Sequence, residues 1–332
     1  MPETKLGVIL LNMGGPDALE DVPAYLLNIF RDPFILDMPL GALVRPWLSR
    51  IIVKKRAGAS AERYRLIGGK TPLNGIAAKQ ADAIRHALAQ RGIAAAAVPG
   101  MRYWHPFTEE GLAQFAEQHV HHVVALPMYP AYSRATSRSS LEDFHRAMKK
   151  HLPGVPSSQV DRWPALPEYI EFLAQHTAEA LHSLGQARWP HTAVLFSAHS
   201  VPMRLIERGD PYKDHIEQTY RLVCERLPQG IRTGLGWQSA VGPARWLEPD
   251  SKHLAASLRA GGADHLVVVP LGFAAENIET LWDIEIDLRA FAREQGFDSF
   301  LRVACPNDDR AVMDGLARLI AETQAEGTRH GD

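Results

Sequence analysis

Short apolar runs alternate with longer amphipathic segments along most of the chain. The apolar runs show no polar alternation and cover residues 6–12, 95–101, 122–127, 193–196, 231–236, 265–270 and 301–304. Because the strands of a parallel sheet are buried on both faces, they read as nearly continuous apolar runs. The pattern therefore predicts a set of buried, mostly parallel strands.

The segments between these runs have helical spacing. They cover residues 75–90, 109–119, 141–151, 167–184, 212–227 and 251–260, and a C-terminal helix is expected at 310–326. Strands that alternate with helices are typical of βαβ units, in which helices cover both faces of a parallel sheet. We therefore expect an α/β fold.

Two pairs of segments indicate an internal repeat. Residues 5–16 resemble 191–202, and 122–130 resemble 265–273, although chance similarity among buried strands is an alternative explanation. A repeat predicts two similar domains with a ligand cleft between them. The predicted boundaries are 1–155 for the first domain, 160–305 for the second, and 306–332 for a C-terminal helix and tail that pack back on the N-terminal half.

The stretch 29–56 departs from the strand–helix pattern. It is rich in apolar residues and proline, has roughly helical spacing over 40–53, and ends in Lys54, Lys55 and Arg56. An amphipathic helix with a basic end can lie on a membrane surface, cover an apolar ligand as a lid, or pack on its own domain. We assign 29–56 as an apolar lip of the first domain, with 29–53 as the candidate for peripheral membrane contact.

Composition narrows the class of protein. The 332 residues are 46% hydrophobic and 22% charged, with a formal net charge of −2, so we expect no nucleic-acid partner. The only cysteines, Cys224 and Cys305, are too few and too far apart for a disulfide framework or a four-cysteine iron–sulfur cluster. Few cysteines, no signal-peptide pattern and no membrane-spanning apolar run together predict a cytoplasmic protein.

His199 is the first candidate for chemistry. It follows the predicted strand 193–196 after two small residues, Ser197 and Ala198. Ligands of open α/β sheets bind beyond the carboxyl ends of the strands. An imidazole, with an unperturbed pKa of about 6.5, can move protons at neutral pH. A loop or core histidine without a catalytic role is the alternative.

A row of carboxylates is the second candidate. A helix is expected to start near residue 273, and on it Glu279, Asp283 and Asp287 would share one face. Positions 274–288 contain no Lys or Arg that would relieve their repulsion. The row is therefore a candidate set of oxygen ligands for a cation, and a solvated acidic face that suits the helix dipole is the alternative.

A series of short motifs carries a family resemblance. In chain order they are Asn-Met-Gly-Gly-Pro (12–16), Tyr-Arg-Leu-Ile-Gly-Gly-Lys-Thr-Pro-Leu (64–73), Met-Arg-Tyr-Trp-His-Pro (101–106), Leu-Pro-Met-Tyr-Pro-Ala-Tyr-Ser (126–133), Phe-Ser-Ala-His (196–199), Trp-Gln-Ser-Ala-Val-Gly-Pro (237–243), Trp-Leu-Glu-Pro (246–249) and Glu-Thr-Leu (279–281). In this order and spacing they resemble the motifs of the ferrochelatase family, over residues 6–307.

The resemblance implies a lyase-type metal chelatase of haem and porphyrin biosynthesis. Its implied fold is two similar Rossmann-like domains, each with a parallel four-stranded sheet flanked by helices, around a porphyrin cleft. The implied reaction is the insertion of Fe²⁺ into protoporphyrin IX, which forms protohaem and releases two protons. A coproporphyrin III ferrochelatase and a cobalt-sirohydrochlorin chelatase are the enzymatic alternatives, and a non-catalytic porphyrin or haem carrier is the alternative from another class.

Residue roles are implied where positions match the motifs of the family. His199 and Glu279 match the pair that accepts pyrrole protons or holds the metal, and Asp283 and Asp287 match a relay for metal or protons. Porphyrin-binding roles are implied for Met13 against the ring, and for Arg56, Arg102, Tyr103, Tyr129 and Ser133, which line the cleft or meet propionates.

Asn277 departs from the family pattern, because many relatives carry a second histidine at this position. The role of that histidine is therefore not transferred. Fe²⁺ is expected as a substrate, with no permanently bound cofactor and no iron–sulfur cluster. The expected state is a monomer or homodimer in the cytoplasm, with the cytoplasmic face of the inner membrane as the candidate contact.

Overall fold

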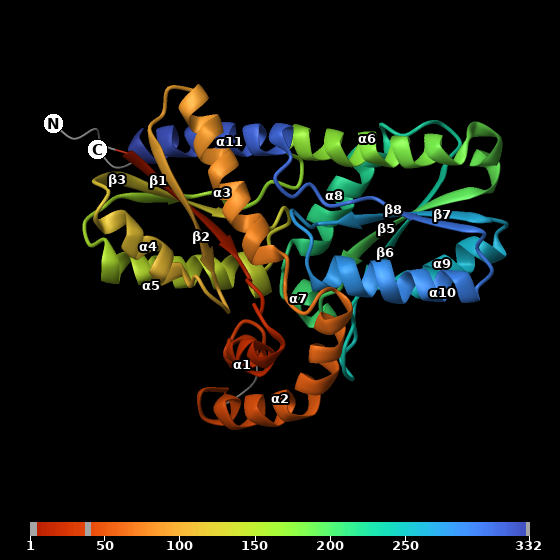
Figure 1. Cartoon of the computed structure of the whole chain (residues 1–332), viewed down its shortest axis with the longest axis horizontal. Coiled ribbons are helices and arrows are strands. Elements are labelled where there is room, and N and C mark those ends of the chain that lie inside the picture. The colour runs from red at the N-terminus through yellow and green to blue at the C-terminus, as the bar shows by residue number, and fades with distance from the viewer. Residues whose placement is uncertain (1–4, 37–40, 330–332) are drawn as a thin grey trace. The chain divides into compact units, whose positions relative to one another are not determined.

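The computed structural model describes residues 5–36 and 41–329, and these fall into two compact units (Figure 1). Unit 1 comprises Met1–Arg162 and Asn307–Asp332, and unit 2 comprises Trp163–Pro306. Residues 37–40 of the predicted lip lie outside the described residues, as do 1–4 and 330–332 at the ends of the predicted domains.

Unit 1 is built on a four-stranded parallel sheet with the order β2-β1-β3-β4. Its strands are β1 (Lys5–Asn12), β2 (Ala95–Met101), β3 (Val120–Pro127) and β4 (Ser157–Gln159). Every residue of the central strand β1 after Lys5 is buried. Burial on both faces explains why the sequence of β1 is an almost unbroken apolar run.

Helices cover both faces of the unit 1 sheet. On one face, α4 (Thr108–Ala116) and α5 (Ser139–His151) contribute Phe115 and Phe144 to a core that contains Ile9 of β1. On the other face, α3 (Leu73–Gln90) contacts β1 and β2, and the C-terminal helix α11 (Arg310–Arg329) contacts β3, β4 and α3 (Figure 1). The chain therefore returns to unit 1 after it completes unit 2.

Unit 2 has a second four-stranded parallel sheet, in the order β6-β5-β7-β8. Its strands are β5 (Thr192–His199), β6 (Arg232–Gln238), β7 (His265–Leu271) and β8 (Ser299–Arg302). One face packs on α9 (Ser251–Ala260), the π-helix η4 (Glu279–Leu288) and α10 (Arg289–Glu294). On the other face lie α6 (Pro167–Leu184) and α8 (Tyr212–Cys224) (Figure 1). The short helices η3 (Gln186–His191) and α7 (Met203–Glu207) flank β5.

The two sheets have the same strand order, and this confirms the predicted α/β fold with two similar halves. The halves also agree in a less common feature: β3 leads into a π-helix, η2 (Arg134–Arg138), and β7 leads into the π-helix η4. Both π-helices continue into an α-helix. The cleft expected between the halves stays a prediction.

Three local predictions need correction. The strand β4 was missed because its three residues are polar and give no apolar run. The strand β8 lies at Ser299–Arg302 rather than 301–304. The segment 273–277, expected to begin a helix, has no regular structure, and the helix begins only at Ile278. Gly272, with φ +84, turns the chain away from β7 before this segment.

The predicted lip consists largely of two helices, α1 (Val22–Arg31), which follows the short helix η1 (Leu19–Asp21), and α2 (Gly41–Leu66). Helix α2 extends well beyond the predicted end at residue 53. Near its start, the side chains of Leu43 and Trp47 are 80% and 63% exposed. Bulky apolar side chains exposed together near a basic segment are typical of an interaction surface.

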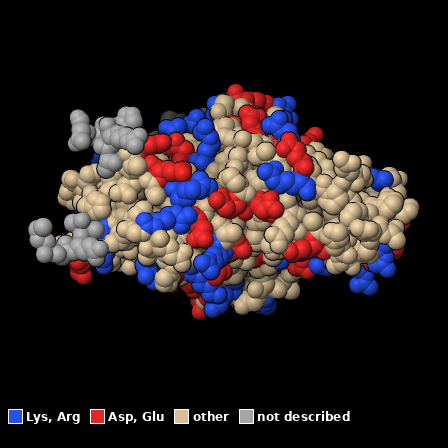
Figure 2. All heavy atoms as spheres, turned by 90° about the horizontal axis from the view of Figure 1, so that it is seen from above, with Lys and Arg blue, Asp and Glu red and all other residues tan. Residues whose placement is uncertain are grey.

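No helix in the described part of the chain is long and apolar enough to cross a membrane. The face of the molecule drawn in Figure 2 carries basic and acidic side chains interspersed with each other rather than gathered by sign.

Candidate active site

His199 is the last residue of β5, at the carboxyl end of the sheet in unit 2. Its backbone carbonyl accepts a hydrogen bond from the hydroxyl of Tyr212 at 2.9 Å, and its Nδ1 lies 2.6 Å from the carbonyl oxygen of Ser200. Because a carbonyl can only accept, Nδ1 must carry the proton. In the neutral form of this half-buried ring the lone pair is therefore on Nε2, an atom that can act as a base or bind a metal.

Glu279 is the first residue of the π-helix η4, and its backbone reaches the same end of the sheet. Its carbonyl oxygen accepts a hydrogen bond from Nε2 of Gln238 at 3.3 Å. Gln238 is the last residue of β6 and the register partner of His199. Residues His199 and Glu279, far apart in sequence, thus come from adjoining segments at the carboxyl end of one sheet.

The other members of the predicted acidic row have protein partners. Asp283 accepts a hydrogen bond from the hydroxyl of Ser239, and Asp287 lies 2.8 Å from the ammonium group of Lys252 on α9. The helix itself supplies no cation to this row, as its sequence indicates, and the partner of Asp287 comes from another helix. Among the described residues no cluster of three or more His, Cys, Asp or Glu side chains is arranged to hold a metal.

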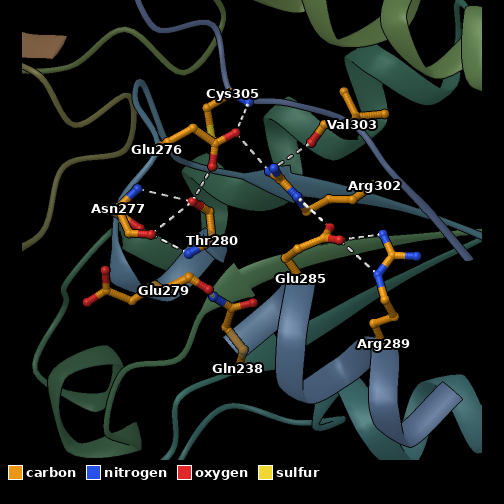
Figure 3. A network of polar contacts seen from close by, with 10 residues as sticks. All are labelled: Gln238, Glu276, Asn277, Glu279, Thr280, Glu285, Arg289, Arg302, Val303 and Cys305. Atoms are coloured by element: carbon orange, nitrogen blue, oxygen red, sulfur yellow. Dashed lines mark hydrogen bonds and ion pairs between the residues drawn. The ribbon is translucent and has the colours of Figure 1, made fainter. Parts of the chain in front are cut away.

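Two further carboxylates near this helix belong to a structural ion network (Figure 3). Arg302 at the end of β8 donates to Glu276 at 2.8 Å and to Glu285 at 3.1 Å, and Glu285 also pairs with Arg289 at 2.6 Å. Burial alone would lower the pKa of Arg302, but the two carboxylates outweigh it and raise that pKa. Glu276 also accepts from the backbone N–H of Cys305 at 3.0 Å. The network ties the segment before η4 to β8.

Asn277 caps the start of the helix that contains η4. Its side-chain oxygen accepts the backbone N–H of Thr280 at 3.0 Å, and the hydroxyl of Thr280 accepts the backbone N–H of Asn277 at 3.1 Å (Figure 3). This reciprocal pair has the geometry of a capping box, which satisfies two N–H groups at a helix start. The residue that departs from the family pattern therefore has a structural role here.

Arg102 and Tyr103 follow β2 in unit 1, and both contact the buried carboxylate of Asp32. Asp32 is 2% exposed and lies 2.9 Å from a terminal nitrogen of Arg102 and 2.8 Å from the hydroxyl of Tyr103. The carboxylate of Asp32 also accepts hydrogen bonds from the hydroxyl of Ser139 and from the backbone N–H of Phe34, the latter at 2.7 Å. The Ser139 hydroxyl in turn accepts from Nε of Arg102 at 2.9 Å. Burial, and then Asp32, raise the pKa of Tyr103 well above its ordinary value. The cluster fixes the guanidinium of Arg102.

Most of the other predicted porphyrin-binding residues lie at the carboxyl end of the unit 1 sheet. Met13 follows β1, is half-buried, and accepts through its carbonyl from the backbone N–H of Tyr103 at 3.0 Å. Tyr129 follows β3, and Ser133 is buried where its hydroxyl accepts the N–H of Ala135 at 3.2 Å and caps η2. Arg56 lies on α2 instead, with its guanidinium 5.7 Å from the ring centre of Phe30. Burial, and then Arg63, lower the pKa of Arg56.

Sequence reasoning assigned no role to Asp32, Gln238 or Lys252. Gln238 stands inside the motif 237–243, so its position at a predicted strand end was the available signal. Asp32 stands before Pro33 at the end of α1, which reads as an ordinary helix stop. Lys252 gave no signal, because its partner is thirty-five positions away on another helix.

The family comparison agrees with this geometry. The family model described as Ferrochelatase matches residues 5–324. A ferrochelatase from Synechococcus elongatus is 40% identical over 322 residues, which cover 96% of this chain and 82% of that protein. A ferrochelatase from Nostoc punctiforme is 38% identical over 321 residues, which cover 96% of this chain and 82% of that protein.

Solved structures support the fold. SirB from Bacillus subtilis with Fe³⁺ matches at a TM-score of 0.56 and 13% identity, over 97% of this chain and 98% of that chain. The sirohydrochlorin chelatase SirB from Bacillus subtilis subspecies spizizenii with cobalt matches at 0.52 and 11% identity, over 96% of this chain and 95% of that chain. Together, the family match, the curated relatives and the duplicated parallel sheets show that this chain belongs to the ferrochelatase family and is a lyase-type metal chelatase with porphyrin and iron as substrates.

Proposed function

We propose that this chelatase inserts Fe²⁺ into protoporphyrin IX, which forms protohaem and releases the two pyrrole protons. The observation that carries the proposal is the approach of the His199 and Glu279 segments at one sheet end, joined through Gln238. A pyrrole N–H is a very weak acid, so its deprotonation needs a base held close to it. Iron is a substrate in this proposal, with no resident cofactor and no iron–sulfur cluster.

In the proposed reaction, Nε2 of His199 accepts a pyrrole proton or binds Fe²⁺, and Glu279 accepts or passes on a proton. The hydrogen bond from Nδ1 of His199 to the carbonyl of Ser200 supports this role, because it leaves the Nε2 lone pair available. Two protons leave for each Fe²⁺ that enters, so charge is balanced.

We further propose that Asp283 and Asp287 form a relay that leads metal or protons to or from Glu279. Their position on the same helix as Glu279 supports the proposal. The ion pair of Asp287 with Lys252 means that a cation must displace the lysine before it can bind that carboxylate.

Unit 1 supplies the proposed contacts with the porphyrin. Arg102 contacts Asp32, Ser139 and, at 3.9 Å, Asp143, and its side chain is 18% exposed; a guanidinium binds a carboxylate such as a propionate well. Tyr103 acts in this proposal by holding Asp32. Met13 presses on the ring with a pliable thioether. The residues proposed to line the propionate side are Arg56, Tyr129 and Ser133.

The apolar lip favours protoporphyrin over coproporphyrin III, the alternative substrate. Protoporphyrin has two propionates and coproporphyrin has four, and the exposed Leu43 and Trp47 suit the more apolar ring. The same side chains support peripheral contact with the cytoplasmic face of the inner membrane. The free thiols of Cys224 and Cys305 suit the reducing cytoplasm, and we propose a monomer or homodimer there.

The test is steady-state insertion of Fe²⁺ or Zn²⁺ into protoporphyrin and coproporphyrin, followed by absorbance. We expect turnover with protoporphyrin, and loss of most activity in His199→Ala and Glu279→Gln with porphyrin binding retained. Faster turnover of coproporphyrin would reverse the substrate assignment. Binding of porphyrin without metallation by the wild type would favour the carrier, and full activity in His199→Ala would refute its role.

A further inference from the structure

Gln238 contacts both segments that carry the proposed catalytic residues. Its backbone carbonyl accepts the N–H of Ser200, the residue after His199, at 2.8 Å. Its side-chain nitrogen donates to the carbonyl of Glu279 at 3.3 Å, and its side-chain oxygen accepts from the hydroxyl of Ser197 at 2.6 Å. Gln238 is 5% exposed, so these bonds have little competition from water.

The amide of Gln238 has one orientation that satisfies its partners. The carbonyl of Glu279 can only accept, so the NH₂ group must face it. The oxygen then faces Ser197, whose hydroxyl donates to it. The hydroxyl of Ser251, the first residue of α9, lies 2.8 Å from the hydroxyl of Ser197. Because the Ser197 hydroxyl donates to Gln238, the Ser251 hydroxyl donates to the Ser197 oxygen. Ser197 and Ser251 are both buried, so the chain of bonds holds the amide in place.

The next residue extends the contact along η4. Ser239 has φ +66, an uncommon backbone conformation for a residue with a side chain, and its hydroxyl donates to Asp283. Two consecutive residues of the chain therefore hold two positions of the π-helix, at Glu279 and at Asp283. A π-helix is rare and is found mainly at functional sites, so such anchoring gives its start a defined place.

We propose that Gln238 is a positioning residue that sets the place of Glu279 relative to His199. The inference rests on the proposed roles of those two residues in proton transfer and metal binding. Gln238 itself touches neither substrate in this inference. Its hydrogen bond holds the backbone of Glu279 in place, and the backbone sets the position from which the carboxylate reaches the site. Small displacements of a catalytic group reduce turnover strongly.

The first test compares Gln238→Met and Gln238→Glu with the wild type. Methionine keeps the length of the side chain and loses both polar contacts, whereas glutamate keeps the acceptor for Ser197 and loses the donor to Glu279. We expect kcat to fall about tenfold to a hundredfold in both variants. We expect the KM for porphyrin to stay within about twofold, because the proposed propionate contacts belong to unit 1.

Gln175→Met is the matched control, because Gln175 is an exposed residue of α6 in the same unit and its side chain donates to Glu179 at 2.9 Å, away from β5, β6 and η4. Its kinetic constants should equal those of the wild type. Ser197→Ala is a second variant, for use if the Gln238 variants fail to fold, because it removes only one hydroxyl. It frees the amide of Gln238 to turn, so a severalfold lower kcat with unchanged KM is expected.

Three results would overturn the inference. One is a kcat within twofold of wild type in a folded Gln238 variant, and another is recovery of full activity in Gln238→Glu. The third is a parallel change of kcat, KM and melting temperature, which would indicate a merely structural role. A His199→Ala arm separates the two proposals: full activity there refutes the assigned catalytic role, while loss there with normal Gln238 variants refutes only the positioning role.

Discussion

Replacing Arg102 by methionine should destabilise unit 1, because it leaves a buried carboxylate without its cation. Asp32 is 2% exposed, and Arg102 lies 2.9 Å from it. Removing one partner of a buried ion pair costs about 3–5 kcal/mol. Asp32 keeps its donors from Phe34, Tyr103 and Ser139, so we expect a loss near the lower limit.

The assay is calorimetric melting of the whole chain. For a unit of 150–250 residues, each kcal/mol shifts the melting temperature by about 2–4 °C, so a loss of about 3 kcal/mol should lower it by about 6–12 °C. Arg85→Met is the matched control, because Arg85 on α3 of the same unit pairs with Asp82 at the surface, where the two side chains are 43% and 70% exposed. Exposed pairs contribute about 0–1 kcal/mol, so the control should stay close to wild type.

The double variant Asp32→Asn with Arg102→Met identifies the cause. Asparagine removes the unpaired charge, so the double variant should recover at least half of the stability lost in Arg102→Met. Arg102→Lys should keep most of the stability but weaken porphyrin binding, because an ammonium lacks the fork that holds a carboxylate at two points. An Arg102→Met protein that melts within about 2 °C of wild type would refute the reasoning, as would a double variant no more stable than the single one.

Three further changes test other parts of the molecule. Asp283→Asn keeps an acceptor for the Ser239 hydroxyl but removes the charge of the side chain. If Asp283 belongs to a relay, this variant should have a severalfold higher KM for Fe²⁺ in steady-state insertion, while Ser239→Ala should leave that KM unchanged. Asn277→Ala removes the cap of the helix and should cost about 1 kcal/mol, seen as a lower melting temperature that Asn277→Asp does not show. Leu43→Glu with Trp47→Glu places charge on the exposed lip and should abolish sedimentation with anionic lipid vesicles, while the melting temperature stays at the wild-type value because both side chains are exposed.

The strand positions and the place of His199 were predictable from sequence because both depend on local pattern. A strand buried on two faces must be apolar along its length, and β1, β5 and β7 have almost no exposed residue. The end of such a run marks the carboxyl edge of the sheet, where His199 lies. The edge strand β4 is polar and is not required to be apolar, so no pattern in the sequence predicted it.

The charge partners were not predictable, because they depend on which segments meet in three dimensions. Asp287 and Lys252 belong to different helices, and Glu276 and Glu285 are paired by Arg302 from the end of β8. Counting charges along one helix therefore overestimated the need for a bound cation. Tyr103 shows the same limit for the residues proposed to bind porphyrin, since nothing in the local sequence reveals that its hydroxyl is buried against Asp32.

The two π-helices explain why the internal repeat is visible in the strands and weak elsewhere. Helices η2 and η4 follow the equivalent strands β3 and β7, yet η2 carries Arg134 and Arg138 while η4 carries four carboxylates and no basic residue. The strands of both units must stay apolar to fill similar cores, which preserves their likeness. Beyond the strand ends only some positions of each π-helix are buried, such as Thr280, Ile284 and Leu288 of η4, so the charges of the positions between them are free to differ. Arg138 of η2 pairs with Glu142, whereas Glu285 and Asp287 of η4 pair with Arg302 and Lys252, so the differing charges of the two π-helices are met by different partners in each unit.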